Sequence, residues 1–454
     1  MRLLLSLLLV VPLGAQTAHQ KIAREIFKEL IEINTTDSVG DNTRAAEAMA
    51  RRFRAAGYPE GDLHILAPMP RKGNLVVRLH GRGAGRPILF FGHLDVVEAR
   101  RADWPFDPFQ FREQDGYFYG RGTSDMKGDD ATLVAAFLRM KQEGFQPARD
   151  LILALTSDEE GGPANGVDWL VKNHRDLIDA EFCINADAGG GHIKKGKHVY
   201  LAIQAAEKVF LSFKLEVTNP GGHSSLPTKD NAIYHLAEGL ARLSKFDFPV
   251  HLFDVTRAAF ERGAGVYGGQ LGEDLKRVVQ DPNDATVVAR LSSSPFYNAQ
   301  LRTTCVATML SAGHAENALP QTATAVVNCR LLPVDKADDV KRTLQQVLAD
   351  PAIQLTEMRE PVITPYTPID PRVTAVVTAA AGKIWPGLPV IPEMGTGATD
   401  SIFLIRAGLP SYGVSGMFGD EDDVRAHGRN ERVLVQAFDQ AVDFMYDVVT
   451  TLGR

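Results

Sequence analysis

Cysteine is scarce in this sequence: three occur in 454 residues, at Cys183, Cys305 and Cys329. None of them stands in a CxxC pair or at a Cys/His spacing typical of a structural zinc site. The odd number leaves at least one thiol unpaired. Cys305 and Cys329 could form a disulfide, although buried free thiols would explain them equally well.

An excess of basic residues is also missing. The chain has 49 Lys and Arg against 56 Asp and Glu, which gives a formal net charge of -7. Because nucleic-acid binding requires positive charge to neutralise phosphates, we expect no nucleic-acid partner. A hydrophobic content of 44% and a charged content of 23% are ordinary for a soluble globular protein. The length suffices for two or three domains.

Long hydrophobic runs are absent except at the N-terminus. There Arg2 precedes the apolar residues 3–11, a run too short to span a bilayer comfortably and typical of a secretory signal peptide. We assign residues 1–15 to this leader, with cleavage after Ala15 or, as second choice, Ala18. A retained N-terminal anchor is the alternative. The expected location is therefore secreted or periplasmic, without membrane contact once the leader is removed.

Strands and amphipathic helices alternate along most of the chain. Strands are predicted at 63–66, 74–79, 87–91, 151–155 and 181–185, and helices at 19–34, 43–56, 130–144 and about 167–174. This order predicts an α/β fold whose mixed, mostly parallel sheet is covered by helices on both faces.

The pattern changes near Val209. Alternating strands at 210–217 and 323–331 enclose a series of helices, which is typical of an α+β domain. We therefore predict a discontinuous catalytic domain, residues 19–206 and 332–454. The inserted domain, residues 207–331, would serve as a lid or dimerisation domain.

Three carboxylates follow the apolar strand at 151–155, in the order Asp158, Glu159 and Glu160. Parallel sheets bind ligands at the carboxyl ends of their strands, and closely spaced carboxylates repel unless a metal or a proton neutralises them. Glu159 and Glu160 could then divide the work, one holding a metal and the other handling protons. The alternative is an acidic turn that faces water.

Other polar residues stand at or just after strand ends. His93 and Asp95 lie on one face of their strand because they are two residues apart. This pair suits a metal ligand oriented by a carboxylate, although a purely structural pair is the alternative. Asp125 stands where a helix begins and could simply cap it. Asp187 follows the strand at 181–185. Their repeated position at strand ends favours one shared site.

Six segments resemble the M20 family of co-catalytic zinc metallopeptidases. They are GHLDVV at 92–97, YGRGTSDMKG at 119–128, SDEEGG at 157–162, PGGHSS at 220–225, NALP at 317–320 and HGRNE at 427–431. They occur in the family's order and span nearly the whole mature chain. Within the family the sequence looks most like carboxypeptidase S and the secreted N-acyl-amino-acid hydrolases.

The resemblance implies two zinc ions per subunit, although other divalent ions are possible. One ion would be held by His93 and Asp187 and the other by Glu160 and His427, with Asp125 bridging both. The same resemblance implies a cis peptide bond after Asp125.

The family's remaining roles concern catalysis and substrate. Glu159 would be the general base, Asp95 the partner of His93, and His223 the lid histidine that stabilises the oxyanion, supplied by the neighbouring subunit in dimeric members. Substrate-binding positions are expected at Asn317, Arg330, Gly397 and Thr399.

Three positions depart from the family's usual pattern. Glu98 and Arg429 stand where the family commonly has proline, and both are outer positions. Asp187 occupies a ligand position that is Asp in some branches and Glu in others.

Asp158 receives no role from the resemblance. Of the three adjacent carboxylates, Asp158, Glu159 and Glu160, it is therefore expected to tolerate replacement best.

These observations predict a co-catalytic di-zinc hydrolase of amide and peptide bonds. The favoured activity is that of an exopeptidase, a carboxypeptidase or dipeptidase acting on small peptides, and the alternative is an N-acyl-amino-acid amidohydrolase. A non-catalytic binding relative is disfavoured because neither the base nor any metal ligand is missing. A homodimer formed through the lid domain is also expected.

Overall fold

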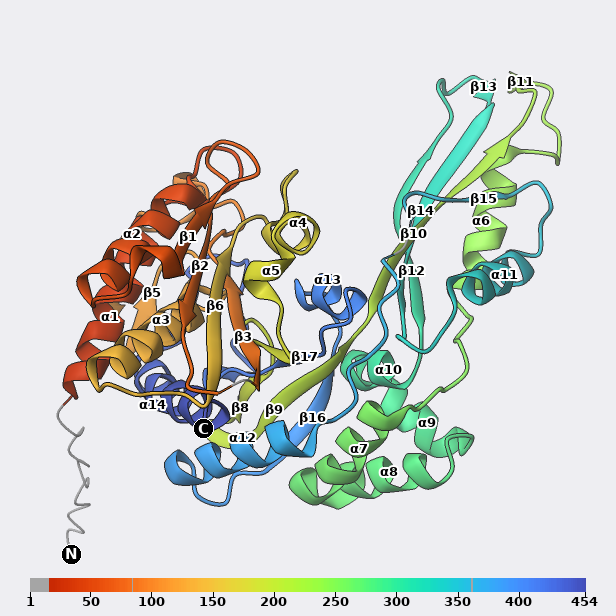
Figure 1. Cartoon of the computed structure of the whole chain (residues 1–454). Coiled ribbons are helices and arrows are strands. Elements are labelled where there is room, and N and C mark those ends of the chain that lie inside the picture. The colour runs from red at the N-terminus through yellow and green to blue at the C-terminus, as the bar shows by residue number, and fades with distance from the viewer. Residues whose placement is uncertain (1–15, 84, 361) are drawn as a thin grey trace, which may run out of the picture.

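The computed structural model describes residues 16–83, 85–360 and 362–454. The predicted leader, residues 1–15, lies outside the described residues. Figure 1 shows a compact body, which contains both termini of the described chain, and an elongated arm that projects from it. None of the described helices is long and apolar enough to span a membrane.

A ten-stranded mixed sheet forms the centre of the body. Its central strands, β6 (Arg149–Thr156), β3 (Gly85–His93), β7 (Phe182–Asn185) and β17 (Ser411–Gly413), are parallel. Residues 151–155 are fully buried in β6, as expected for an apolar strand covered on both faces. The remaining strands of this sheet are β1 (Leu63–Leu66), β2 (Asn74–Leu79), β8 (Gly190–Lys194), β9 (Lys197–Glu207), β16 (Val390–Gly395) and β18 (Phe418–Asp420).

Helices cover both faces of this sheet, which confirms the predicted α/β fold. One face carries α1 (Ala18–Glu32), α2 (Asn42–Ala55), α3 (Lys127–Gln142), α12 (Pro371–Ile384) and α14 (Val435–Leu452). The other carries α4 (Gly166–Asn173), α5 (Arg175–Ile178) and α13 (Ser401–Arg406), which lie toward the arm in Figure 1. Local signals fix the helix starts: Thr17 and Gln20 form a capping box on α1, and Asp370 caps α12.

A small sheet and two short 3-10 helices complete the body. The three-stranded sheet contains β4 (Arg112–Gln114), β5 (Tyr117–Tyr119) and β19 (Arg432–Leu434). The 3-10 helices are Glu60–Asp62 and Arg101–Asp103.

The arm is built on a four-stranded antiparallel sheet with its own core. The strand order is β12 (Thr304–Ala312), β14 (Thr322–Leu331), β10 (Val209–Thr218) and β15 (Gln354–Glu357). Buried side chains alternate along β10 and β14, and the apolar face packs against α6 (Ala232–Leu243) and α11 (Ala337–Leu348). The short pair β11 (Gly222–His223) and β13 (Ala318–Leu319) lies at the far end of the arm (Figure 1).

Four helices that follow α6 lie beside the body. They are α7 (Asp254–Tyr267), α8 (Gly269–Gln280), α9 (Ala285–Ser292) and α10 (Pro295–Leu301). Their side chains form a small core of their own, and Ala259, Val266 and Tyr267 of α7 contact Tyr200 and Ile391 of the large sheet.

The division into two domains stays a prediction, but these contacts bear on its boundaries. Residues 337–357 were assigned to the catalytic domain, whereas α11 and β15 pack on the arm. Residues 254–301 were assigned to the inserted domain, whereas α7 packs on β9 and β16. The arm therefore includes β15, and the helices α7–α10 belong structurally with the body.

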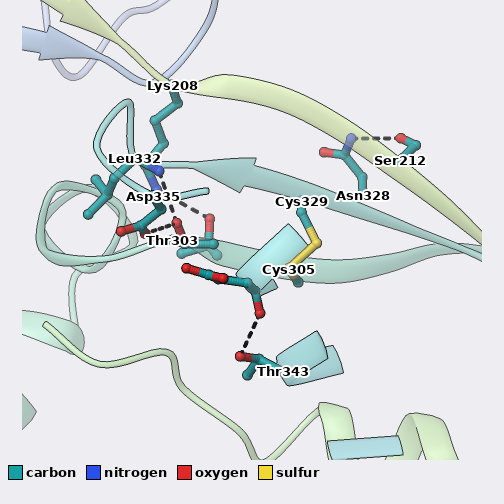
Figure 2. The surroundings of a disulfide bond; sticks show 11 residues. Lys208, Ser212, Thr303, Cys305, Asn328, Cys329, Leu332, Asp335 and Thr343 are labelled. Carbon is teal, nitrogen blue, oxygen red and sulfur yellow. Dashed lines mark hydrogen bonds between the residues drawn. A yellow bond between two sulfur atoms is a disulfide. The ribbon is translucent and has the colours of Figure 1, made fainter. Parts of the chain in front are cut away.

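Cys305 and Cys329 form a disulfide, one of the two alternatives that the sequence left open. They occupy directly opposed positions on β12 and β14. Figure 2 shows this disulfide at the base of the arm, near Thr303. The Thr303 hydroxyl donates a hydrogen bond to the Asp335 carboxylate at 2.5 Å. Cys183 remains a buried free thiol.

Candidate metal centre

Five side chains that were expected to bind metal meet at the carboxyl edge of the large sheet. His93 ends β3, while Glu160 and Asp187 stand just after β6 and β7. Asp125 precedes α3, and His427 lies in the loop before β19. Neighbouring parallel strands place their carboxyl ends at one edge, so residues far apart in the sequence become neighbours.

His93 is oriented to offer one ring nitrogen to the centre. Its side chain is buried, and its Nδ1 donates a hydrogen bond to the carbonyl oxygen of Asp95 at 3.0 Å. Its Nε2 lies 3.2 Å from Asp125 Oδ1 and 3.6 Å from Asp187 Oδ1. With the proton on Nδ1, the Nε2 lone pair is free to bind a cation.

Asp125 directs one oxygen to each histidine. Its Oδ1 faces His93, and its Oδ2 lies 2.9 Å from His427 Nε2. The same His427 nitrogen is 2.9 Å from Glu160 Oε1. The Asp125–Met126 peptide bond is cis, as the family resemblance implies. Asp125 therefore stands between two groups of ligand atoms, the arrangement required of a bridging carboxylate.

The donor set fits divalent metal ions. Ligand atoms of His93, Glu159 and Asp187 lie within 4.8 Å of one another, as do those of His93, Asp125 and Glu160. Among the described residues the buried Nε2 of His93 has no hydrogen-bond partner of good geometry. A buried nitrogen surrounded by carboxylates, with imidazole and carboxylate as the only donors, suits zinc or a similar cation.

The charges of this cluster also favour cations. Burial, with help from neighbouring carboxylates and against the pull of His93, raises the pKa of Asp187 to about 6. Hydrogen bonds to Asp125 and Glu160 raise the pKa of His427 to about 10. Protons thus balance the clustered carboxylates, and bound divalent ions would supply the same positive charge.

Glu159 lies beside the centre with its carboxylate uncommitted. Asp95 accepts hydrogen bonds from the backbone nitrogens of Glu159 at 3.1 Å and Glu160 at 3.0 Å, which fixes the turn that carries both. Burial is the main cause that raises the pKa of Glu159 to about 10. Its oxygens are close enough to His93 and Asp187 for metal binding. Its role as base rather than ligand therefore stays a prediction.

Asp158 has a structural role that the sequence did not reveal. Its buried carboxylate lies 2.5 Å from the ammonium of buried Lys72 and accepts a hydrogen bond from the backbone nitrogen of Ala164 at 3.2 Å. Removing one partner of a buried ion pair leaves the other charge uncompensated. The expectation that Asp158 tolerates replacement best is therefore revised.

Sequence reasoning also missed the support beneath Asp125. Buried Glu431 accepts hydrogen bonds from the backbone nitrogens of Ser124 at 2.8 Å and Asp125 at 3.2 Å, and its other oxygen pairs with Arg121 at 2.5 Å. The only signal was the position of Glu431 in the HGRNE segment. Asp400, a second missed acidic residue, is buried and bonds Asn165 at 2.6 Å.

His223 and Asn317 lie together, but far from the metal ligands. Both are at the distal end of the arm, where β11 pairs with β13 (Figure 1). The backbone nitrogen of Ser224 donates to the Asn317 carbonyl at 3.1 Å. His223 is exposed, and its ring is 2.7 Å from the Ser225 hydroxyl. Within one chain, the structure does not bring them to the metal centre.

The remaining substrate-binding candidates lie on the arm side of the body. Half-buried Arg330, at the base of the arm, stacks on Phe210 and has no ion-pair partner among the described residues. The Thr399 hydroxyl accepts a hydrogen bond from Asn185 at 3.0 Å and donates to Glu207. Gly397 is exposed in the same loop. Arg330 is thus available for an anion, while the Thr399 hydroxyl is already engaged.

The sequence is similar to those of two curated proteins. The chain is 27% identical over 390 residues to the N-fatty-acyl-amino acid synthase/hydrolase PM20D1 of Xenopus tropicalis, covering 80% of this chain and 72% of that protein. It is 27% identical over 387 residues to a probable carboxypeptidase S-like protein of Dictyostelium discoideum, covering 80% and 71% of the two chains.

A solved structure shows the same fold. It is an M20 family metallo-carboxypeptidase from Sulfolobus solfataricus, with a TM-score of 0.69 and 18% sequence identity, covering 94% of this chain and 98% of that one. The sequence profile of peptidase family M20/M25/M40 matches residues 89–451. That match contains each of the predicted metal ligands, and the chain belongs to peptidase family M20/M25/M40.

Proposed function

We propose that this protein is a di-metal hydrolase that cleaves the amide bond between an acyl group and a free amino acid. The observation that carries the proposal is Asp125, whose two oxygens face His93 and His427 at 3.2 and 2.9 Å. The names of the two relatives support two forms of this activity. One is an exopeptidase, a carboxypeptidase or dipeptidase acting on small peptides, and the other is an N-acyl-amino-acid amidohydrolase.

Zinc is the metal that this donor set favours, in two ions per subunit. His93 and Asp187 would hold one ion, Glu160 and His427 the other, with Asp125 shared. When bound, such ions polarise the scissile carbonyl and lower the pKa of water.

Glu159 is the proposed general base. It would accept a proton from the attacking water and deliver it to the leaving amine nitrogen. Asp95 supports this role because it holds the backbone nitrogens of Glu159 and Glu160, and so sets which carboxylate faces the substrate.

The free carboxylate of the substrate is expected on the arm side. Within the part of the chain that the structure describes, Arg330 has no carboxylate partner, and the backbone nitrogen of Thr399, in the loop with Gly397, donates to Glu207 at the end of β9 at 2.8 Å. A guanidinium holds a carboxylate through two parallel hydrogen bonds, which would favour substrates that end in a free amino acid.

A homodimer would bring His223 to the metal centre of the second subunit. The edge strand β12 exposes Val306 by 60%, Met309 by 67% and Leu310 by 68%. Exposed apolar edge strands pair readily with a second chain. Symmetric pairing along β12 is the proposed contact, and His223 would then stabilise the developing oxyanion in trans.

Export is proposed from the leader at residues 1–15 together with the disulfide. Disulfides form and persist in oxidising compartments. N-terminal sequencing of the protein from its native host tests this, because a mature chain that begins at Met1 would exclude cleavage.

A substrate screen tests the proposed function. The zinc-loaded full chain is incubated with dipeptides and N-acyl amino acids, and the free amino acid released is measured. Hydrolysis of either class is expected, and its loss with a chelator and return with zinc would link it to the metals. No hydrolysis of any of these compounds would favour a non-catalytic binding relative.

A further inference from the structure

The peptide unit that joins Asp158 to Glu159 is held at both of its polar atoms. Its N–H donates to the Asp95 carboxylate at 3.1 Å, and its carbonyl oxygen accepts a hydrogen bond from the Asn165 side chain at 3.2 Å. Because a peptide unit is planar, these two bonds restrict its orientation and so the direction in which the Glu159 side chain leaves the backbone. Asp158 also has a φ of 62°, which residues other than glycine adopt only where their surroundings enforce it.

Asn165 uses every polar atom of its side chain. Its Nδ2 carries two hydrogens, and besides the carbonyl of Asp158 it donates to Asp400 Oδ1 at 2.6 Å. Its Oδ1 accepts a hydrogen bond from the backbone nitrogen of Asp168 at 2.9 Å and thereby caps α4. The amide therefore cannot turn over without losing bonds on both sides.

Asp400 connects this amide to the loop at residues 395–401, which we call the carboxylate loop because it is expected to bind the carboxylate of the substrate. Asp400 follows Thr399 in this loop and precedes α13 (Figure 1). Its side chain is buried, with 4% of the residue exposed, and among the described residues its Oδ2 has no hydrogen-bond partner. A buried carboxylate with so few bonds is costly to the fold, so a role in the site explains it better than stability does.

We propose that Asn165 and Asp400 are positioning residues, which connect the carboxylate loop to the base Glu159. When the loop engages the free carboxylate of a substrate, Asp400 holds Asn165, and Asn165 holds the carbonyl that precedes Glu159. This inference rests on the proposed function, in which Glu159 is the base. It adds that binding of the terminal carboxylate raises kcat and does not only lower KM.

Asn165→Asp tests the positioning of the base, because it removes the amide donor and keeps the oxygen that caps α4. The zinc-loaded full chain is assayed on the N-acyl amino acid or dipeptide that the wild type hydrolyses fastest. We expect kcat to fall by about tenfold to a hundredfold, with KM changed by less than about threefold. Zinc content should remain that of the wild type, because Asn165 bonds Asp158, Asp168 and Asp400 rather than a proposed ligand.

Asn173→Asp is the matched control. Asn173 lies on the same helix, and its exposed amide donates to the backbone carbonyl of Trp169 at 2.9 Å. Its replacement removes the same kind of donor away from the site, so kcat should equal that of the wild type.

An exchange of the two side chains separates positioning from simple pairing. In the double variant Asn165→Asp with Asp400→Asn, the amide at position 400 can donate to the carboxylate at position 165. The stability lost in Asn165→Asp through two adjacent carboxylates should therefore return, as measured by urea denaturation. The carbonyl of Asp158 still lacks its donor, so kcat should stay as low as in the single variant.

A substrate with a blocked carboxylate tests the connection to the loop. The C-terminal amide of the same substrate lacks the group that the carboxylate loop would bind. In the wild type its kcat should be about tenfold below that of the free acid, and in Asn165→Asp the two kcat values should agree within about twofold. Asp400→Ala leaves Asn165 intact and should give the same result, which supplies the test if Asn165→Asp does not fold.

The outcomes distinguish this inference from the proposed function. A kcat within about twofold of the wild type in Asn165→Asp or Asp400→Ala would overturn the positioning role, as would recovery of kcat together with stability in the exchanged variant. Equal kcat for acid and amide in the wild type, or a ratio that the substitutions leave unchanged, would overturn the connection to the carboxylate loop. Absence of hydrolysis by the wild type would instead overturn the proposed function itself.

Discussion

At the scale of single residues, three adjacent carboxylates have three different environments. Glu160 lies 2.9 Å from His427 Nε2, Asp158 is paired with Lys72, and Glu159 faces the centre without a hydrogen-bonded cation. Neighbouring residues of one turn point in different directions, so adjacency in the sequence does not imply a shared role. Burial and partner together decide what each carboxylate does.

Asp158→Asn tests the buried pair with Lys72. Asparagine keeps the shape and tolerates the positive φ of 62° at this position, so the change removes mainly the charge. We expect a loss of about 3 kcal/mol in the free energy of unfolding, measured by urea denaturation. Lys72 also contacts Asp37 at 2.6 Å, which moderates the loss.

Asp168→Asn is the matched control. Asp168 pairs with Lys172 on the surface of α4, where such pairs contribute at most about 0.5 kcal/mol. Equal stability of both variants and the wild type would show that the Lys72 pair contributes nothing.

The sequence predicted the residues that meet at the carboxyl edge of the sheet, and Asp95 beside them, but it did not predict the roles of Lys72 and Glu431. His93, Asp125 and Glu160 stand in motifs or at strand ends that sequence can reveal. Lys72 contacts Asp158, which is 86 residues away in the sequence, and Glu431 contacts Asp125, which is 306 residues away. No local sequence pattern predicts a contact over such a separation. Tertiary packing determines which side chains hydrogen-bond to the residues of a site, and a single sequence does not reveal that packing.

At the scale of elements, periodicity predicted which segments form strands and helices. It could not predict which sheet each helix meets, because an amphipathic pattern shows an apolar face but not its partner. α7 illustrates this: it belongs to the inserted stretch, yet its apolar residues contact Tyr200 and Ile391 of the body. α11 and β15 show the converse, since they follow the predicted boundary and pack on the arm.

The disulfide between β12 and β14 can be tested at this scale. Its two cysteines are 24 residues apart, and a link of this length typically contributes about 2–4 kcal/mol. The double variant Cys305→Ser with Cys329→Ser should therefore unfold at a lower urea concentration than the oxidised wild type. Reductant should lower the midpoint of the wild type but not that of the variant. A wild type insensitive to reductant would indicate that the bond does not form in solution.

At the scale of the whole molecule, His223 belongs to β11 at the far end of the arm, whereas the candidate metal ligands follow β3, β6 and β7 of the body (Figure 1). In the proposed dimer, a second subunit paired along β12 would supply this residue, and activity would then require two subunits.

Subunit mixing tests this arrangement. His223→Ala and Glu159→Gln should each be nearly inactive alone. Unfolding and refolding them together should restore about a quarter of wild-type activity, because half of the symmetric dimers are mixed and each mixed dimer has one complete site.

The monomer-only alternative gives a different result. Mixing two variants that act within single chains would restore nothing, and a wild type that is monomeric and active by light scattering would remove His223 from a role in trans. Mixing wild type with Glu159→Gln provides the control for refolding yield.

Metal content tests the central claim most directly. Replacing a bridging Asp125 should lower the zinc content, whereas replacing a non-ligating Glu159 should leave it unchanged. The full chain is loaded with zinc, dialysed and analysed by inductively coupled plasma mass spectrometry, alongside Glu159→Gln and Asp125→Ala. Two equivalents are expected in the wild type and in inactive Glu159→Gln, and fewer than two in Asp125→Ala. One equivalent or none in the wild type, or loss of zinc in Glu159→Gln, would contradict a two-metal centre with Glu159 as its base.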